Sequence, residues 1–322
     1  MKRFIVVLLA LIVCASMVFA GGGKQKAGGA APGQKRILFS NPWYTAPYSA
    51  PLMEAAMKKA AELGYFLQIV DGEGNTEKQL SQFRTAHADG YDGFIYWPGD
   101  LASTPTLVDY LKSTGKPWVV INMMVDESVQ DQVPSTTASD EVEIGRWLGR
   151  LTIEFFEKNS SLAKNVAYIE GSPGSSYTTN LTTGINEIIA GKGINILNEP
   201  MYSDFDPSRA MAITEDLITR FGSRIVLILS QDGGMFQGAY SAVESAGYLG
   251  KMHFICQGQD LIVREKLESG ELYASVAQDP YVEGSLAVEN LDKLIRGVPA
   301  EKWQKVPTGP IYKADVAKYT WF

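Results

Sequence analysis

The chain contains two successive series of short apolar segments, and segments with helical periodicity lie between them. The first series covers residues 36–40, 65–70, 93–97 and 117–122, and the second covers residues 165–170, 194–197, 224–229 and 252–257. Each segment is rich in branched or aromatic residues, which is typical of strands buried on both faces of a parallel sheet. The repeated order of strand and helix predicts an α/β protein with two Rossmann-like lobes of similar build.

Further segments connect the two series and follow the second. An amphipathic stretch covers 139–159, and the tail contains an apolar run at 272–278, a helical pattern at 283–297 and an extended piece to Phe322. We expect the chain to cross between lobes near residues 137–139, 278–280 and 307–310. The predicted division is an N-terminal lobe of residues 36–138 plus 279–306 and a C-terminal lobe of residues 139–278 plus 307–322.

The first twenty residues predict export. Lys2 and Arg3 precede an apolar run that reaches Val18, and a small residue, Ala20, ends the segment. This pattern is typical of a secretory signal peptide, so we predict cleavage after Ala20 and a periplasmic location.

A lipoprotein is the alternative to a cleaved soluble product. Cys14 follows three apolar residues, but Val13 is not the small residue that a lipobox has before its cysteine. Residues 21–35 are rich in Gly, Ala and Lys, which predicts a flexible linker.

Charge and reactive groups exclude several classes of protein. The net charge is −7 and no basic stripe is visible, so we predict no nucleic-acid partner. The two histidines, His87 and His253, fit no metal spacing, and no nucleophile elbow or phosphate loop appears. Cys256 is interpreted as a small buried apolar residue. The sequence therefore predicts no enzyme activity, no cofactor and no metal.

Ligands of open parallel sheets bind beyond the carboxyl ends of the strands, so the residues that follow each predicted strand are the candidates. In the first half these are Trp43, Tyr44, Tyr48, Trp97 and Asn122. In the second half they are Asn180, Phe205, Asp232, Gln257, Gln259 and Asp260. Aromatic rings that stack on C–H faces, together with groups that pair buried hydroxyls, favour a sugar or polyol.

The sequence leaves a structural alternative open at several of these positions. Trp97 and Phe205 could pack within their lobes, and Tyr44 and Tyr48 could be surface rings. Asp232 could cap the helix that follows it. Asn122 could hold a turn at the end of its strand.

The chain also resembles the type I periplasmic solute-binding proteins of ABC importers, above all the ribose-binding branch. The likeness covers residues 36 to 310 and rests on six motifs that follow the order of the family. They are "PYSAPLMEAAMKKAAELGY", "KPWVVINMM", "ASDEVEIGRWLG", "SDFD" (203–206), "SQDGGMFQGA" (230–239) and "SVAQDP" (275–280). The resemblance implies two lobes with parallel sheets, joined by a three-segment hinge that closes on a ligand.

The resemblance also implies roles for particular residues. It implies ligand contacts at Tyr48, Phe205, Asp232 and Gln278, although Gln278 also suits a bond to hinge backbone. Trp43 and Tyr44 are candidates to replace a second stacking ring of the family.

Both sugar-binding arginines of the family are missing from this chain. Asn122 and Met123 stand where the family has an Asp-Arg pair, and Asn180 and Leu181 stand at the second arginine. This argues against a simple copy of ribose specificity and against an anionic ligand. Gly258 stands where an aspartate is common.

We therefore predict an extracytoplasmic, monomeric solute-binding protein. It captures a neutral sugar or polyol in a cleft between its lobes and delivers it to an ABC permease in the inner membrane. Two alternatives stay open: a ligand-sensing receptor for a membrane sensor kinase or chemoreceptor, and a nucleoside-binding import protein, because the many rings also suit a base.

Overall fold

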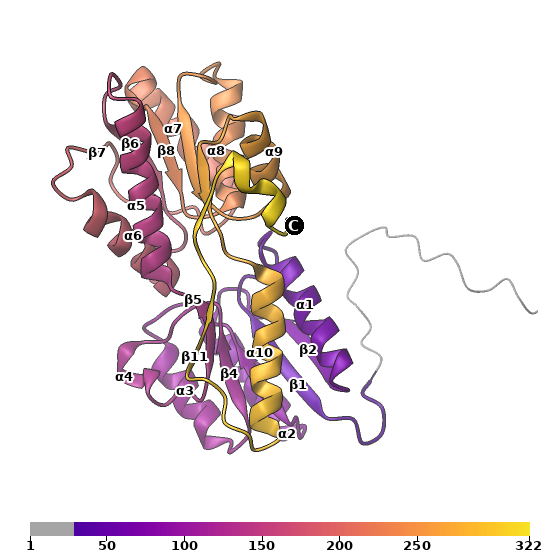
Figure 1. Ribbon diagram of the computed structural model, residues 1–322. Coiled ribbons are helices and arrows are strands. Elements are labelled where there is room, and N and C mark those ends of the chain that lie inside the picture. Colours follow the sequence, from indigo (N-terminus) through magenta and orange to yellow (C-terminus); the bar gives the residue numbers. More distant parts are fainter. Residues whose placement is uncertain (1–28) are drawn as a thin grey trace, which may run out of the picture.

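The computed structural model describes residues 29–322 and contains two α/β lobes, one above the other in Figure 1. Each lobe has a six-stranded sheet, with strand orders β11-β5-β4-β3-β1-β2 and β12-β10-β9-β8-β6-β7. The pairings within these sheets are parallel, apart from the antiparallel pairing of β10 with β12. The prediction of two parallel-sheet α/β lobes is confirmed. The predicted signal peptide, Cys14 and residues 21–28 of the predicted linker lie outside the described residues.

The N-terminal lobe contains the first strand series and the last long helix. Its strands are β1 (Arg36–Asn41), β2 (Phe66–Asp71), β3 (Gly93–Tyr96), β4 (Trp118–Ile121), β5 (Thr136–Ser139) and β11 (Trp303–Val306). Its helices are α1 (Ser49–Glu62), α2 (Thr76–Ala88), α3 (Thr104–Ser113), α4 (Glu127–Gln130) and α10 (Pro280–Ile295).

The C-terminal lobe contains the second series and the tail. Its strands are β6 (Asn165–Ile169), β7 (Asn195–Ile196), β8 (Leu227–Ser230), β9 (His253–Gln257), β10 (Ala274–Val276) and β12 (Pro310–Ile311). Its helices are α5 (Glu141–Lys158), α6 (Ser176–Ile189), α7 (Pro207–Phe221), α8 (Gly233–Ser245) and α9 (Leu261–Ser269), with short 3-10 helices η1 (Gly222–Arg224) and η2 (Lys313–Lys318).

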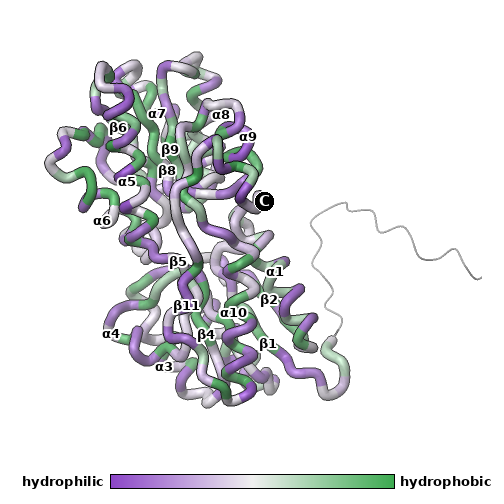
Figure 2. The backbone as a smooth tube through the Cα atoms, viewed as in Figure 1, coloured by the Kyte–Doolittle hydropathy of each residue, from purple (hydrophilic) through white to green (hydrophobic). Residues whose placement is uncertain are grey.

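The N-terminal sheet is covered by helices on both faces. Ile37 and Phe39 of β1 belong to a cluster with α1 and α10, whereas Leu38 belongs to a separate cluster with α2 and α3. Successive residues of a strand point to opposite faces, so a strand with both faces covered must be apolar throughout. Figure 2 shows the corresponding hydrophobic strands inside the lobes, with hydrophilic segments toward the outside.

Three connections join the lobes. Asp140 links β5 to α5, residues 277–279 link β10 to α10, and residues 307–309 link β11 to β12. In each case the elements before and after the connection belong to different lobes. The residue-level boundaries of the two lobes stay a prediction.

The C-terminal segments differ from the expected pattern in two places. The helix expected at 283–297 begins earlier, at Pro280, because the Asp279 side chain accepts hydrogen bonds from the N–H groups of Tyr281 and Val282. The prediction of an extended piece to Phe322 was wrong for residues 313–318. These form η2, where Asp315 accepts a hydrogen bond from the Tyr312 N–H.

Candidate functional site

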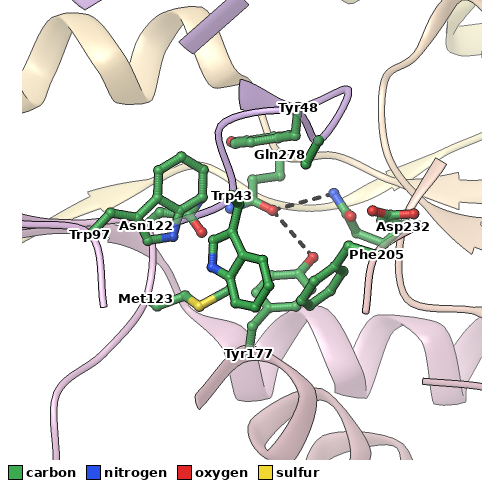
Figure 3. Close-up of a pocket in the computed structure, with 11 residues that line it drawn as sticks. Trp43, Tyr48, Trp97, Asn122, Met123, Tyr177, Phe205, Asp232 and Gln278 are labelled. Atoms are coloured by element: carbon green, nitrogen blue, oxygen red, sulfur yellow. Dashed lines mark hydrogen bonds between the residues drawn. The ribbon is translucent and has the colours of Figure 1, made fainter. Parts of the chain in front are cut away.

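A cavity of about 40 Å³ lies between the lobes, at the edge where the carboxyl ends of both sheets meet (Figure 3). The lining residues come from both lobes and are mostly aromatic or amide-bearing. They are Trp43, Ala46, Tyr48, Trp97, Asn122, Met123, Tyr177, Phe205, Asp232, Gln257 and Gln278.

Aromatic rings from the two lobes touch across this cavity. Trp43 of the N-terminal lobe meets Phe205 of the C-terminal lobe edge-on, with ring centroids 5.5 Å apart. Tyr177 packs on Phe205 in a similar way at 6.0 Å, and Tyr48 packs edge-on against Trp97 at 6.5 Å. Such edge-to-face pairs are favourable, and each large ring buries much apolar surface.

Backbone contacts also bridge the lobes beside the rings. The Leu101 N–H donates to the Gly174 carbonyl at 3.0 Å, and the Met124 N–H donates to Ser176 Oγ at 2.9 Å. Leu101 and Met124 belong to one lobe and their acceptors to the other. The structure is therefore the closed arrangement of the two lobes.

Local hydrogen bonds fix Trp43 in the connection after β1. The Trp43 N–H donates to Asn41 Oδ1 at 2.8 Å, and its carbonyl accepts from Ser49 Oγ at 2.6 Å. The connection between β1 and α1 therefore turns tightly, and the indole is directed into the cavity (Figure 3).

Phe205 is held by a strained turn. Asp204 and Phe205 have φ values of 55° and 56°, in the left-handed region that non-glycine residues rarely adopt. Ser172 Oγ donates to the Asp204 carboxylate at 3.0 Å, which supports the turn. The Phe205 ring lies so close to Gly171 that a Cβ there would stand 2.2 Å from the ring.

A buried carboxylate holds two of the lining side chains. Tyr48 Oη and Asn122 Nδ2 both donate to Glu283 Oε2 at 2.7 Å. Glu283 is fully buried, and this burial raises its pKa to about 8. Its other oxygen, Oε1, has no hydrogen-bond partner among the described residues. Glu283 was not among the predicted site residues, because an acidic residue in the first turn of a helix is ordinary.

Asp232 is a helix cap and a lining residue at once. Its Oδ1 accepts a hydrogen bond from the Met235 N–H at 2.6 Å at the start of α8. Burial raises the pKa of Asp232 to about 7. Asp232 therefore does cap α8, as the structural alternative predicted, and its carboxylate also faces the cavity (Figure 3).

Gln278 lies in the connection between β10 and α10. Its Oε1 accepts a hydrogen bond from Tyr177 Oη at 3.2 Å, as Figure 3 shows. Tyr177 was not predicted as a site residue, because it lies inside the first turn of α6, where sequence alone does not tell which side chains turn toward the cleft.

Three donors at the cavity have no partner among the described residues. They are Trp43 Nε1, Trp97 Nε1 and Gln278 Nε2, all buried. Buried polar groups are almost always hydrogen-bonded, because an unpaired group loses its bonds to water without replacement. These donors therefore indicate a ligand with hydrogen-bond acceptors.

The remaining predicted site residues lie outside the lining. Tyr44 is 37% exposed, because the turn that directs Trp43 inward leaves Tyr44 on the surface. Asn180 Nδ2 donates to Glu141 Oε2 at 2.6 Å within the C-terminal lobe. Gln259 Nε2 donates to the Thr320 carbonyl at 2.9 Å and so holds the tail. Asp260 borders a separate pocket beside Phe322.

Within residues 29–322, no group of three or more His, Cys, Asp or Glu side chains is arranged to hold a metal ion. In the same part of the chain, no helix has the length and apolar character needed to cross a membrane.

Comparison with known proteins gives consistent matches. A family model described as a periplasmic binding protein domain matches residues 37–299. The ribose import binding protein RbsB of Bacillus subtilis is 26% identical over 261 residues, which cover 81% of this chain and 82% of that protein. RbsB of Haemophilus influenzae is 27% identical, with coverage of 81% and 85%.

Solved structures show the same fold. A galactofuranose binding protein superposes with a TM-score of 0.82 at 20% identity, over 88% of this chain and 96% of that one. An ABC transporter solute binding protein from Bacillus halodurans with bound myo-inositol superposes with a TM-score of 0.81 at 22% identity, over 91% and 99%.

Proposed function

The chain belongs to the periplasmic binding protein family, and on that premise we propose that it is the solute-binding component of an ABC importer. We propose that it captures a neutral sugar or polyol between its lobes. The resemblance to the type I sugar-binding branch is confirmed by the family match and by its relatives. The relatives are named for ribose, and the superposed structures for galactofuranose or bound myo-inositol. These names support the same ligand class here.

One observation carries the proposal: aromatic rings and unpaired hydrogen-bonding groups line the same cavity. The indole N–H groups of Trp43 and Trp97 need acceptors, and the Asp232 carboxylate, an acceptor when ionised, faces the same cavity. A hydroxyl group is both donor and acceptor, so a polyhydroxylated ligand satisfies both sets. Its C–H faces would pack on the rings, as in other apolar pockets with a few placed polar groups.

The cavity contains no side chain suited to an anion. No lysine or arginine lines it. Asn122 and Met123 stand where the family has an Asp-Arg pair. A buried phosphate or carboxylate would stay without a counter-charge, which is costly. The proposed ligand therefore carries no acidic group.

Hinge closure is the proposed mechanism. The bonds from Leu101 to Gly174 and from Met124 to Ser176 join the lobes, so they exist only while the lobes are closed. A ligand that contacts both walls favours the closed state by the contacts it makes only there. The closed form is what a permease would recognise. This role needs no bond-making and no cofactor.

The remaining proposals concern export and assembly. We place the protein in the periplasm, with a signal peptide cleaved after Ala20, or alternatively with a lipid on Cys14. The protein acts as a monomer beside its permease in the inner membrane.

A thermal-shift screen of neutral sugars, polyols and nucleosides on the chain from residue 21 onward tests the proposal. A ligand that binds only the native state raises the melting temperature, by an amount that grows with its concentration. We expect stabilisation by at least one sugar or polyol, with an affinity then measured by calorimetry. Stabilisation by nucleosides alone, or by no member of the set, would overturn the proposed ligand class.

A further inference from the structure

We infer that the carbohydrate ligand carries a protonated amine, which the cavity holds between the Asp232 carboxylate and the surrounding aromatic rings. The inference rests on the proposed function and changes one part of it: the polyhydroxylated frame is kept, while one neutral substituent becomes a cation.

The first observation is the density of rings. The five that line the cavity are Trp43, Tyr48, Trp97, Tyr177 and Phe205. The face of an aromatic ring is electron-rich and attracts cations, most strongly where water is excluded. A group of aromatic rings around one site is an arrangement that proteins use for quaternary ammonium ligands.

The second observation is an excess of acid without any base. Asp232 lines the cavity, and Glu283 lies directly behind the lining through its bonds to Tyr48 and Asn122. No lysine, arginine or histidine lines the cavity. Among the described residues, the fully buried polar set likewise contains carboxylates but no basic side chain.

Buried carboxylates without a counter-charge are unstable as anions. They must either hold a proton or be paired with a cation. Burial raises the pKa of Asp232 to about 7. A ligand ammonium would supply the missing positive charge at the one carboxylate that faces the cavity.

The third observation is that the two unpaired indole N–H groups lie apart from the Asp232 carboxylate. Figure 3 shows the two indole nitrogens on one side of the cavity and Asp232 on the other. Trp43 Nε1 and Trp97 Nε1 lack partners and can only donate, so they require oxygen atoms from the ligand. Asp232 can only accept when ionised. A ligand with hydroxyl or ether oxygens at one end and an amine at the other matches both sides.

Matched ligand pairs test the inference. The pairs are glycerol with 2-amino-1,3-propanediol, D-glucose with D-glucosamine, and D-galactose with D-galactosamine. N-acetyl-D-glucosamine and N-acetyl-D-galactosamine are neutral controls of similar shape. Binding is followed at pH 7 by calorimetry and by the fluorescence of the cavity tryptophans. We expect the amino member of at least one pair to bind ten-fold or more tightly than its neutral partner.

The variant Asp232→Asn assigns the effect to the carboxylate. Asparagine caps a helix as well as aspartate does, so the fold should be kept while the charge is removed. We expect the preference for the amine to fall below about three-fold. The matched control is Asp206→Asn, which changes the cap of α7, where the carboxylate accepts from the Arg209 N–H at 2.8 Å outside the cavity. Its amine preference should stay unchanged.

The outcomes separate the inference from the proposed function. If neutral members bind as tightly as amino members, the inference is wrong and the sugar proposal stands. If neither member of any pair binds and the wider carbohydrate screen is also negative, both are wrong. A preference for amines that survives in Asp232→Asn would overturn the assignment of the cation to this carboxylate.

Discussion

The two lobes share a plan of six strands with helices on both faces, but the strand ends that meet at the cavity carry different chemistry. The N-terminal wall presents indole N–H groups from Trp43 and Trp97, and the C-terminal wall presents the Asp232 carboxylate. The two sheets determine where the two sides of the cavity lie, and a few residues after each strand determine which ligand groups each side can bind. Similar scaffolds therefore allow donors and acceptors to be placed on opposite sides of one ligand.

The largest expected effect comes from removing the Asp232 carboxylate, the hydrogen-bond acceptor on the C-terminal side of the cavity. Asp232→Ala should weaken ligand binding by about two to four powers of ten, because a buried carboxylate makes charge-assisted bonds of roughly 1.5–3 kcal/mol each. It should also lower the free energy of unfolding by about 1 kcal/mol through the lost cap. Calorimetry and thermal melting on the same variant separate the two effects. Lost stability with unchanged affinity would remove Asp232 from the site.

The second prediction tests the charge of both walls together. A sugar phosphate or sugar acid should bind at least about a hundred-fold more weakly than its neutral parent, since neither wall supplies a cation to an anionic group. Competition calorimetry with matched pairs measures this ratio. Micromolar binding of the anionic members with none of the neutral ones would contradict it.

The third prediction concerns a substitution that removes one hydrogen-bond donor from the N-terminal side of the cavity. Trp43→Phe keeps a ring but removes the N–H, which has no partner among the described residues. Binding should become about five- to ten-fold weaker, in keeping with one lost hydrogen bond of about 1 kcal/mol. Unchanged affinity would show that the indole acts only by packing.

The smallest expected effect is the change in stability with pH. It is tested by comparing the buried Glu283 with an exposed acid on the same helix. Burial raises the pKa of Glu283 to about 8, above its value of ~4 in the unfolded chain. The folded state then binds more protons than the unfolded state between these values, so the ligand-free protein should lose stability as the pH rises from 5 to 8.

The melting temperature measures this slope. We expect a decrease of about 5 °C from pH 5 to pH 8 and a smaller decrease in Glu283→Gln. Glu289→Gln is the control, because Glu289 is 40% exposed and pairs with Lys59 at the surface. A melting temperature that rises over this range, or an equal slope in all three proteins, would contradict the assignment.

The strands were predictable because burial on both faces leaves a plain mark in sequence. Ile37, Leu38 and Phe39 are successive and buried, as a covered parallel strand requires. The cavity edge was predictable for the same reason, since strand ends fix where ligand groups lie. The direction of single side chains was not. Tyr44 and Trp43 are neighbours of similar character, and only the hydrogen bonds of the turn decide which ring faces inward.

Buried acids were the other feature that sequence did not reveal. Glu141 begins α5 and looks like ordinary dipole compensation, yet it is buried and takes the amide of Asn180, which removes Asn180 from the cavity. Glu283 is similar at the start of α10. Whether an acid in a first helical turn faces water or a neighbouring lobe depends on how distant segments pack, and no local pattern encodes that.

The position of α10 in the chain constrains when the protein can fold. Val288 and Leu291 of this helix cover the face of the N-terminal sheet that includes Ile37, although about 250 residues of sequence separate them. Until the ribosome has released residue 295, that face is covered by α1 alone, and β11 is also missing from the sheet edge. Contacts of such long sequence separation form slowly. The growing chain therefore holds an unfinished first lobe until nearly all of it has been made.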